Sequence, residues 1–322
     1  MNEFETIEKY FAPLTMGYEG SAGLCDDAAV LEIPEGHELV VTSDTLNEGI
    51  HFLEGEAPEN IARKALRVNL SDLAAMAATP LCYQLNLAFP EKPTEAWLRA
   101  FTDALYEDNE SFHIFCSGGD TTSIKGGALS ISMTAMGTVP KGTAVRRGGA
   151  KAGDAIILTE SVGDAVLGLK LLQGGLDKAS FSTAIERYRV PRPRTQTVDI
   201  LRKYAHAAAD ISDGLIADCL HIAKASNLCA EIDIEKIKFS QAVERAIDQK
   251  IITLEQAIKG GDDYELVLAV PDQNVALALS ELQKINLKPL VIGHFKDSDL
   301  SLEMLNSDGL QMDQSAFGWT HF

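Results

Sequence analysis

Four aspartates constrain this chain most, because each lies in a short run of small polar residues next to an apolar segment. The runs are Ser43-Asp44-Thr45, Asn69-Leu70-Ser71-Asp72, Gly118-Gly119-Asp120-Thr121-Thr122 and Asp210-Ile211-Ser212-Asp213-Gly214. Carboxylates that folding brings together repel one another unless a hard cation lies between them. The pattern therefore predicts a magnesium site, and magnesium with open positions is typical of proteins that bind phosphate groups.

The length and charge of the chain limit what it can be. A chain of 322 residues exceeds one ordinary hydrophobic core, so we expect two domains. Its formal charge is 28 − 47 = −19, which argues against nucleic acid or an anionic membrane as a partner. No apolar run is long enough to span a bilayer, and five cysteines without a C-x-x-C pair are typical of reduced thiols. We therefore expect a cytoplasmic protein.

Hydrophobic periodicity outlines the first half of the chain. It predicts helices over 2–12, 59–78 and 94–108, and strands over 28–33, 38–43, 81–89, 112–117 and 128–139. This order of strands and helices predicts an antiparallel or mixed sheet with helices on one face.

A stretch rich in glycine and basic residues, 140–152, marks the expected boundary between domains 1–140 and 141–322. The second half begins again with a buried strand and continues as an α/β pattern. Its expected strands are 154–159 and 264–270, and its expected helices are 163–173, 195–205 and 215–225. The fold class is therefore α/β, in two domains.

Asp72 is the strongest candidate ligand. It lies three residues after Asn69, so both project from one face of the expected helix. A solvated polar stripe is the alternative, but the surrounding residues are nearly all apolar or small, and a buried carboxylate needs a partner. Metal ligation is therefore favoured for Asp72. Asp44 comes at the end of an apolar strand, where either a ligand or a turn cap is expected.

The remaining motifs allow two interpretations each. The glycines before Asp120 let a phosphate approach backbone amides, yet such triplets also form ordinary turns. Arg147, beside two glycines, could bind a phosphate or lie in an interdomain loop. Ser212 and Asp213 could cap a helix or bind an anion at its N-terminus. His51 comes shortly after Asp44 in the chain, but a lone histidine is more often structural than functional.

Motifs of several large enzyme classes are absent from the sequence. It contains no G-x-x-x-x-G-K-[ST], G-x-G-x-x-G, G-x-S-x-G or H-E-x-x-H. If the protein handles phosphate, it does so mainly through metal ions and backbone groups.

Taken in order, the motifs resemble those of the thiamine-monophosphate kinases, members of the superfamily that includes aminoimidazole ribonucleotide synthetase. The resemblance spans essentially the whole chain. Its matching segments are Asp26-Asp27-Ala28, Thr42-Ser43-Asp44-Thr45, Gly49-Ile50-His51-Phe52, Lys64–Met76, Gly118–Thr122, Arg147–Asp154, Asp210–Leu215, Gly260–Leu266 and Gly318–Phe322.

The resemblance implies a fold and an assembly. The N-terminal domain, 1–140, would bind metal and ATP and would form a homodimer, because its four-stranded sheet closes into a barrel with the same sheet of a second subunit. The C-terminal α/β domain, 141–322, would pack on it, with ATP and metals in the cleft between the two halves.

The resemblance also implies residue roles. The expected magnesium ligands are Asp27, Thr42, Ser43, Asp44, Asp72, Asp120, Asp210 and Asp213, of which Asp44, Asp72, Asp120 and Asp213 would be catalytic. The expected ATP contacts are Gly119, Asp120, Arg147 and Ser212, and the expected substrate contacts are His51, Asp262 and Trp319. One departure is visible, since the family usually has Gly-Gly-Glu-Asp where this chain has Gly260-Gly261-Asp262-Asp263.

The implied reaction transfers the γ-phosphoryl group of ATP to thiamine monophosphate, giving thiamine diphosphate, with several Mg²⁺ ions as cofactors. Three alternatives remain open. A sister enzyme of the same superfamily would act on another substrate. A non-catalytic nucleotide- or thiamine-binding protein would lack turnover. A metal-dependent phosphohydrolase would release phosphate without an acceptor.

Overall fold

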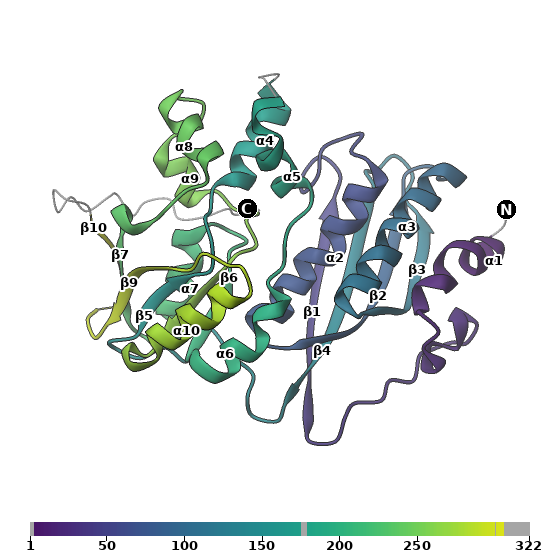
Figure 1. Cartoon of the computed structure of the whole chain (residues 1–322). Helices are drawn as coiled ribbons and strands as arrows, with labels where there is room; N and C mark the ends of the chain where they lie inside the picture. Colours follow the sequence, from purple (N-terminus) through teal and green to yellow (C-terminus); the bar gives the residue numbers. More distant parts are fainter. Residues whose placement is uncertain (1–2, 175–178, 300, 306–322) are drawn as a thin grey trace. The chain divides into compact units, whose positions relative to one another are not determined.

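The computed structural model describes residues 3–174, 179–299 and 301–305 of the chain, which divides into two compact units (Figure 1). Unit 1 comprises Met1–Leu73 and Ala78–Gly142, and unit 2 comprises Ala74–Ala77 and Thr143–Phe322. Among the described residues, no helix is long and apolar enough to cross a membrane.

Unit 1 contains one four-stranded sheet in the order β1-β4-β2-β3. β2 and β3 are parallel, and the other two pairs are antiparallel, so the sheet is mixed as predicted. Helices α2 and α3 cover one face of it (Figure 1). The elements are β1 (His37–Asn47), α2 (Pro58–Ala75), β2 (Thr79–Phe89), α3 (Glu95–Phe112), β3 (Phe115–Ser123) and β4 (Ser130–Pro140).

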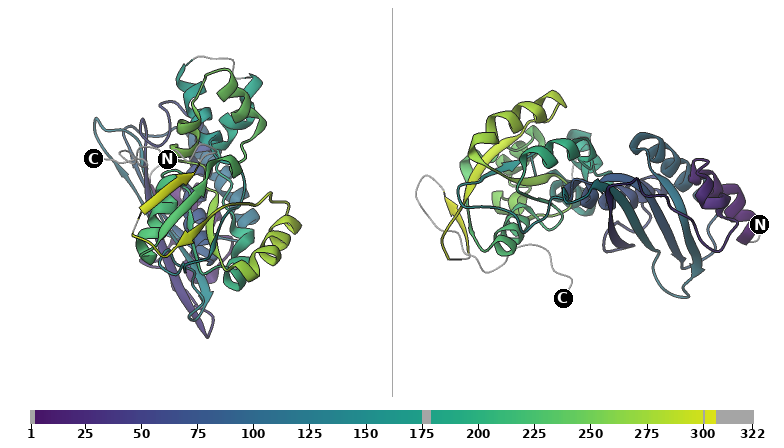
Figure 2. Two further views of the ribbon diagram at one scale, coloured as in Figure 1. Left: turned by 90° about the vertical axis from the view of Figure 1, so that its left-hand side faces the viewer. Right: turned by 90° about the horizontal axis from the view of Figure 1, so that it is seen from below.

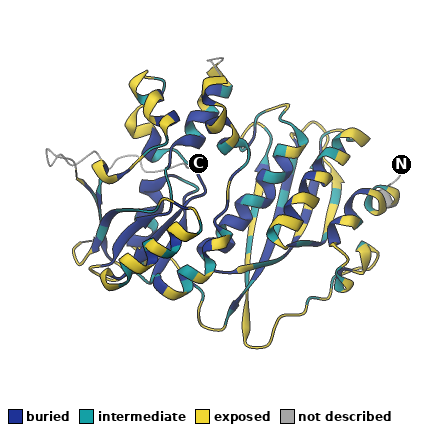
Figure 3. Ribbon diagram, viewed as in Figure 1, coloured by how far each residue is buried: buried dark blue, intermediate teal, exposed yellow. Residues whose placement is uncertain are grey.

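The two faces of this sheet differ in polarity. Under the helices, the rows across the strands are apolar on β4 and β2 but partly polar on the two edge strands. On β1, Asp44 pairs with buried Met133, which in turn pairs with buried Leu85, and on β3 Thr121 pairs with buried Leu87. Buried positions of α3 alternate with exposed ones, whereas α2 is buried or half-buried at every position except Glu59 (Figure 3). The next row lies on the other face and is polar throughout, formed by Thr45, Ser132, Asn86 and Asp120. Strand alternation therefore sorts the polar side chains between the two faces.

The N-terminal expectations were wrong in part. The segment 28–33 is not a strand, because its backbone bonds to no neighbouring strand; the Val30 amide instead donates to the Gly20 carbonyl at 2.8 Å, and Val30 is 72% exposed. The expected helix 2–12 is helical from Glu3 onward, in three consecutive pieces whose hydrogen-bond pattern changes from α to π to 3-10. They are α1 (Glu3–Thr6), η1 (Ile7–Phe11) and η2 (Ala12–Thr15), followed by η3 (Glu19–Leu24).

β1 and β3 are longer than the apolar pattern predicts, and both run through their polar motifs. Asp44 is therefore inside a strand and not at its end. β3 includes Gly119, whose backbone has a φ of +154°, and a Cβ there would lie 1.8 Å from the Leu85 carbonyl oxygen. Glycine is required at this position because β2 approaches it too closely for a side chain.

Unit 2 contains a six-stranded sheet in the order β10-β7-β9-β5-β8-β6, in which only β10 and β7 are parallel among the described strand pairs. The strands are β5 (Ala155–Leu158), β6 (Ala207–Asp210), β7 (Cys229–Asp233), β8 (Leu266–Val270), β9 (Leu290–Lys296) and β10 (Ser301–Leu305). β8 begins two residues later than expected, since Tyr264 has a φ of +51°, which is incompatible with a strand.

Helices lie on both faces of this sheet. α7 (Leu215–Ser226) packs on one face, and α6 (Val198–Tyr204) and α10 (Asp272–Lys284) pack on the other; both views of Figure 2 show α10 along its side of the sheet. A third apolar cluster joins α4 (Asp164–Gly174), α5 (Ser182–Arg189), α8 (Gln241–Asp248) and α9 (Leu254–Lys259). The short turns are η4 (Ala179–Phe181), η5 (Thr195–Thr197) and η6 (Ile234–Lys236). Both units are therefore α/β.

Candidate active site

In unit 1 the structure brings Thr42, Asp44 and Asp72 together. Thr42 and Asp44 lie on the helix-covered face of β1, and the Thr42 hydroxyl donates a short hydrogen bond to Oδ2 of Asp72 on α2. Burial, and then the charge of Asp72, raise the pKa of Asp44 from 3.8 to about 6. Two carboxylates are thus held close together in an apolar layer, where their repulsion is not screened by water.

Asn69 adds a third polar group on this side of α2. It is fully buried, and its Nδ2 donates to the Ala65 carbonyl at 3.0 Å. Its Oδ1 accepts no hydrogen bond from any residue that the structure describes. Carboxylate, hydroxyl and amide oxygens are the donors that Mg²⁺ prefers, so this group of residues fits the expected magnesium ion.

Ser43 does not join this group through its side chain. Strand alternation places its hydroxyl on the opposite face of β1, where Oγ donates to the Met133 carbonyl at 3.1 Å and lies 3.0 Å from the Thr134 hydroxyl. A magnesium contact through the Ser43 side chain would therefore lie on the face opposite to Thr42 and Asp44, and Ser43 as a ligand stays a prediction.

His51 follows β1 and has a fixed ring. The Asn47 amide donates to its Nδ1 at 3.0 Å, so the ring proton is on Nε2. Lys64, on α2, donates to the His51 carbonyl at 2.9 Å and holds the same turn. His51 can therefore donate from Nε2 to an acceptor such as a phosphate.

Asp27, Gly119 and Asp120 line one cavity of about 430 Å³ between the N-terminal coil and β3. They do not lie with Asp44 and Asp72 as the sequence suggested. Two strands, β4 and β2, separate β1 from β3, a distance of about 14 Å at the usual strand spacing. Within unit 1 the four expected acids therefore form two separate groups, because the sheet order places β1 and β3 at opposite edges.

In unit 2 the expected nucleotide and substrate motifs lie side by side. The Asp262 amide donates to the Ser212 carbonyl and the Tyr264 amide to the Ile211 carbonyl, both at 2.9 Å. A Cβ on Gly261 would lie 2.1 Å from the Ser212 carbonyl oxygen, so only glycine permits this approach. A change in one motif must therefore move the other.

Asp262 suits its backbone conformation. Its φ is +69°, in the left-handed region that aspartate tolerates better than most residues. The Tyr264 hydroxyl donates to Asp262 Oδ1 at 3.0 Å and orients the carboxylate. The departure from the family glutamate therefore occurs where a short side chain is held in place.

The two acids that follow point inward and anchor the segment, a role that we did not predict. Glu265 is fully buried and accepts from Arg187 at 2.5 Å and from Arg194 at 2.7 Å. The Thr159 hydroxyl also donates to Glu265, at 2.8 Å. Asp263 accepts from the backbone amides of Gly163 and Ala165, at 2.7 and 3.2 Å. No pattern in the sequence distinguishes these two inward acids from Asp262, because the segment precedes β8 and does not follow strand alternation.

The remaining predicted residues of unit 2 lie around α7. Asp210, 2% exposed, ends β6, and Ser212 follows it. The Arg147 carbonyl accepts from the Ser226 hydroxyl at 3.2 Å, at the last residue of α7. Trp319 lies outside the described residues.

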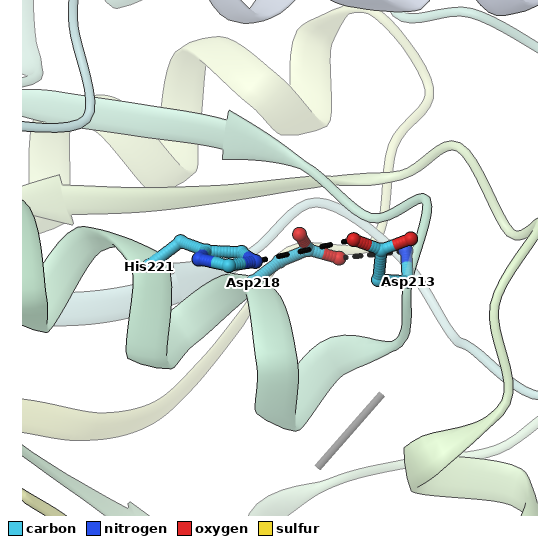
Figure 4. A group of neighbouring side chains, drawn as sticks. All are labelled: Asp213, Asp218 and His221. Carbon is cyan, nitrogen blue, oxygen red and sulfur yellow. Dashed lines mark hydrogen bonds and ion pairs between the residues drawn. The ribbon is translucent and has the colours of Figure 1, made fainter. Parts of the chain in front are cut away.

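Asp213 lies beside two residues that sequence reasoning missed, Asp218 and His221 (Figure 4). Oδ2 of Asp218 accepts from the Asp213 amide at 3.1 Å, and Nε2 of His221 lies 3.9 Å from Oδ2 of Asp213. Burial and the charge of Asp213 raise the pKa of Asp218 to about 7. Their spacing on α7, three residues apart, was the available signal.

The chain was compared with known proteins. Residues 25–139 match the family model for AIR synthase related protein, N-terminal domain, and residues 151–304 match the model for the C-terminal domain. A thiamine-monophosphate kinase from Caulobacter vibrioides is 40% identical over 323 residues, covering 99% of this chain and 90% of that protein.

Two solved structures are similar throughout. The crystal structure of a thiamine-monophosphate kinase from Stenotrophomonas maltophilia K279a has a TM-score of 0.85 and 36% identity, covering 94% of this chain and 98% of that one. A structure described as AaThiL complexed with AMPPCP and TMP has a TM-score of 0.79 and 30% identity, covering 92% and 91%.

The fold and the paired domain matches define an AIR synthase related protein. Within that class, the chain belongs to the thiamine-monophosphate kinase family.

Replacing Asp44 should change how stability depends on pH. Because its folded pKa is raised, Asp44 stabilises the fold below its ordinary pKa of 3.8, and this contribution is lost as the pH rises through about 6. Without metal, Asp44→Asn should therefore exceed the wild type in free energy of unfolding by ~2–3 kcal/mol at pH 7.5 and by little at pH 4. Urea unfolding at both pH values measures this.

Adding Mg²⁺ gives a second comparison between the wild type and Asp44→Asn. Millimolar Mg²⁺ should stabilise the wild type at pH 7.5 and leave Asp44→Asn nearly unchanged, since the ion offsets the repulsion that the variant lacks. Asp248→Asn, an exposed site on α8, is the control. If the free energy of unfolding depended on pH equally in the wild type and in Asp44→Asn, the raised pKa of Asp44 would be contradicted.

Two arginines provide a matched test of the buried anchor. Arg194→Ala should lower the free energy of unfolding by about 3–5 kcal/mol, because it removes a cation from the fully buried carboxylate of Glu265. Arg192→Ala should cost less than about 1 kcal/mol, since the Arg192–Glu186 pair is 54% and 55% exposed. Similar losses in the two variants would contradict the anchor.

Proposed function

We propose that this chain transfers the γ-phosphoryl group of ATP to the phosphate of thiamine monophosphate, forming thiamine diphosphate and ADP with the help of Mg²⁺. The observation that carries the proposal is similarity along the whole chain to a protein solved with AMPPCP and TMP. Membership of the thiamine-monophosphate kinase family supports the same reaction.

The oxygen groups of unit 1 support the magnesium part of the proposal. Thr42, Asp44 and Asp72 offer hard donors and an excess of negative charge, as the raised pKa of Asp44 shows. Mg²⁺ held there would neutralise phosphate charge and allow two anions to approach. We assign further metal contacts to Asp27, Asp120, Asp210 and Asp213, and to the main chain at Ser43.

The other residues supply binding and orientation. A substrate phosphate is already an anionic nucleophile near neutral pH, so the reaction needs no strong general base. His51 offers a fixed Nε2–H donor, and Asp262 an oriented carboxylate, for thiamine monophosphate. Trp319 completes the proposed substrate contacts. Gly119, Asp120, Arg147 and Ser212 are the proposed contacts to ATP, in which backbone amides and a guanidinium meet phosphate oxygens.

We propose that the protein is a homodimer in which two unit 1 sheets close a barrel. β1 and β3 are the edges of the four-stranded sheet, and the outer side of each pairs with no other strand among the described residues. On β1, Leu39 and Val41 are 43% and 55% exposed. A second copy would pair these edges and cover the exposed apolar side chains.

We also propose a cytoplasmic location. All five cysteines lie within the described residues as free thiols, and four of them are buried. A reducing compartment keeps such thiols unpaired, and it is also where ATP is abundant.

A coupled assay tests the activity. The wild type should form thiamine diphosphate from thiamine monophosphate and Mg-ATP, while Asp72→Asn should lose about 100-fold or more in kcat because a ligand to the Mg²⁺ that neutralises the phosphate charge is gone. Asp262→Ala should raise the KM for thiamine monophosphate about tenfold and leave that for ATP unchanged. Asp248→Asn is the control. Phosphate release without thiamine diphosphate would instead show a phosphohydrolase.

Light scattering tests the dimer. The wild type should have twice the mass of one chain, and Val41→Lys should have the mass of one chain, because a charge would be buried at the paired edge. Leu277→Lys, at a position that is 54% exposed on α10, matches the change in chemistry and should stay dimeric. A wild type with the mass of one chain would overturn the barrel.

A further inference from the structure

Asp213, Asp218 and His221 form a compact group inside unit 2. One ligand atom from each residue lies within 4.8 Å of the other two (Figure 4). Two of the residues are on consecutive turns of α7, and Asp213 comes two residues before that helix begins. α7 and the turn that leads into it therefore position the three groups, all of which belong to unit 2.

The Asp218 carboxylate marks this group as more than an exposed acidic cluster. The residue is fully buried, and its Oδ2 accepts the Asp213 amide. Its Oδ1 accepts no hydrogen bond from any residue in the described part of the chain. The Arg147 charge and the Ser212 and Asp213 amides act on this carboxylate and lower its pKa, but burial and the charge of Asp213 outweigh them, and Oδ1 itself has no hydrogen-bond donor among the described residues. Such an oxygen suits a ligand of positive charge.

The distances suit one ion. Two atoms bound to the same ion at about 2.1 Å lie at most about 4.2 Å apart. Nε2 of His221 and Oδ2 of Asp213 are 3.9 Å apart, and both side chains are 41% exposed. They are beyond hydrogen-bond reach of each other, yet a small rotation of either side chain brings both onto one ion that enters from solvent.

The donor set differs from that of Thr42, Asp44 and Asp72. Oxygen donors alone suit Mg²⁺, whereas an imidazole nitrogen with two carboxylates suits first-row transition metals such as Mn²⁺ or Zn²⁺. We propose that Asp213, Asp218 and His221 bind one divalent transition-metal ion, which fixes the Ser212–Asp213 turn beside the Asp262 segment. This inference shares Asp213 with the magnesium contacts of the proposed kinase reaction and rests on that proposal there, but ion binding without nucleotide is measured separately from turnover.

Manganese provides the probe. The full-length chain, stripped of metal and kept in excess Mg²⁺ so that oxygen-only sites are filled, is titrated with Mn²⁺ without nucleotide while electron paramagnetic resonance reports free Mn²⁺. We expect one Mn²⁺ per chain, with a ¹⁴N coupling from an imidazole in the electron spin echo.

Two ligand variants and one control isolate the site. Asp218→Asn and His221→Gln should each weaken Mn²⁺ binding at least about tenfold, and His221→Gln should also abolish the ¹⁴N coupling. The control is His294→Gln, because His294 also lies beside a carboxylate, 3.7 Å from Asp272, and is 44% exposed, but belongs to no such three-residue group among the described residues. It should bind Mn²⁺ as the wild type does.

The outcomes are distinct. Circular dichroism of each variant excludes unfolding, and Asn at 218 keeps an acceptor for the Asp213 amide. Unchanged binding in His221→Gln, or an equal loss in His294→Gln, would overturn the inference and leave an ordinary ion pair. A chain that binds Mn²⁺ as described but forms no thiamine diphosphate would refute the proposed function alone.

Discussion

Burial of carboxylates is the constraint on which the rest of this structure depends. Charged groups in an apolar layer must be paired, hydrogen-bonded or bound to an ion. In unit 1, Asp44 and Asp72 face each other between a sheet and a helix with the Thr42 hydroxyl as a hydrogen-bond donor, so their charge remains available to a cation. The same burial that raises the pKa of Asp44 makes this place suitable for a metal.

In unit 2 the buried carboxylates are paired with groups of the protein itself. Glu265 is matched by two guanidinium groups and Asp263 by two backbone amides, so these acids are structural. Their anchoring holds Asp262 in a left-handed conformation that is unfavourable on its own. The buried Asp263 and Glu265 thus fix the position of Asp262. Because Gly261 closely approaches Ser212, the position of Asp262 also depends on the Ser212 motif.

Some of this could be predicted and some could not. The helix that carries Asp72 was clear from its apolar surroundings, and the mixed sheet followed from the order of elements. The segment 28–33 was misassigned because an alternating apolar pattern says nothing about whether a partner strand is available. β1 and β3 were predicted too short because both strands continue through polar residues, and a linear pattern does not distinguish a polar strand end from a loop.

The sequence by itself determined the residue types, their motif order and hence the family, because small residues around acids are rare enough in that order to be specific. Only the tertiary structure decided which acids meet. It placed Asp44 with Asp72, Asp27 with Asp120, and Asp213 with Asp218 and His221. Strand order and strand alternation set these groupings, and both depend on contacts between residues far apart in the chain, which local pattern does not encode.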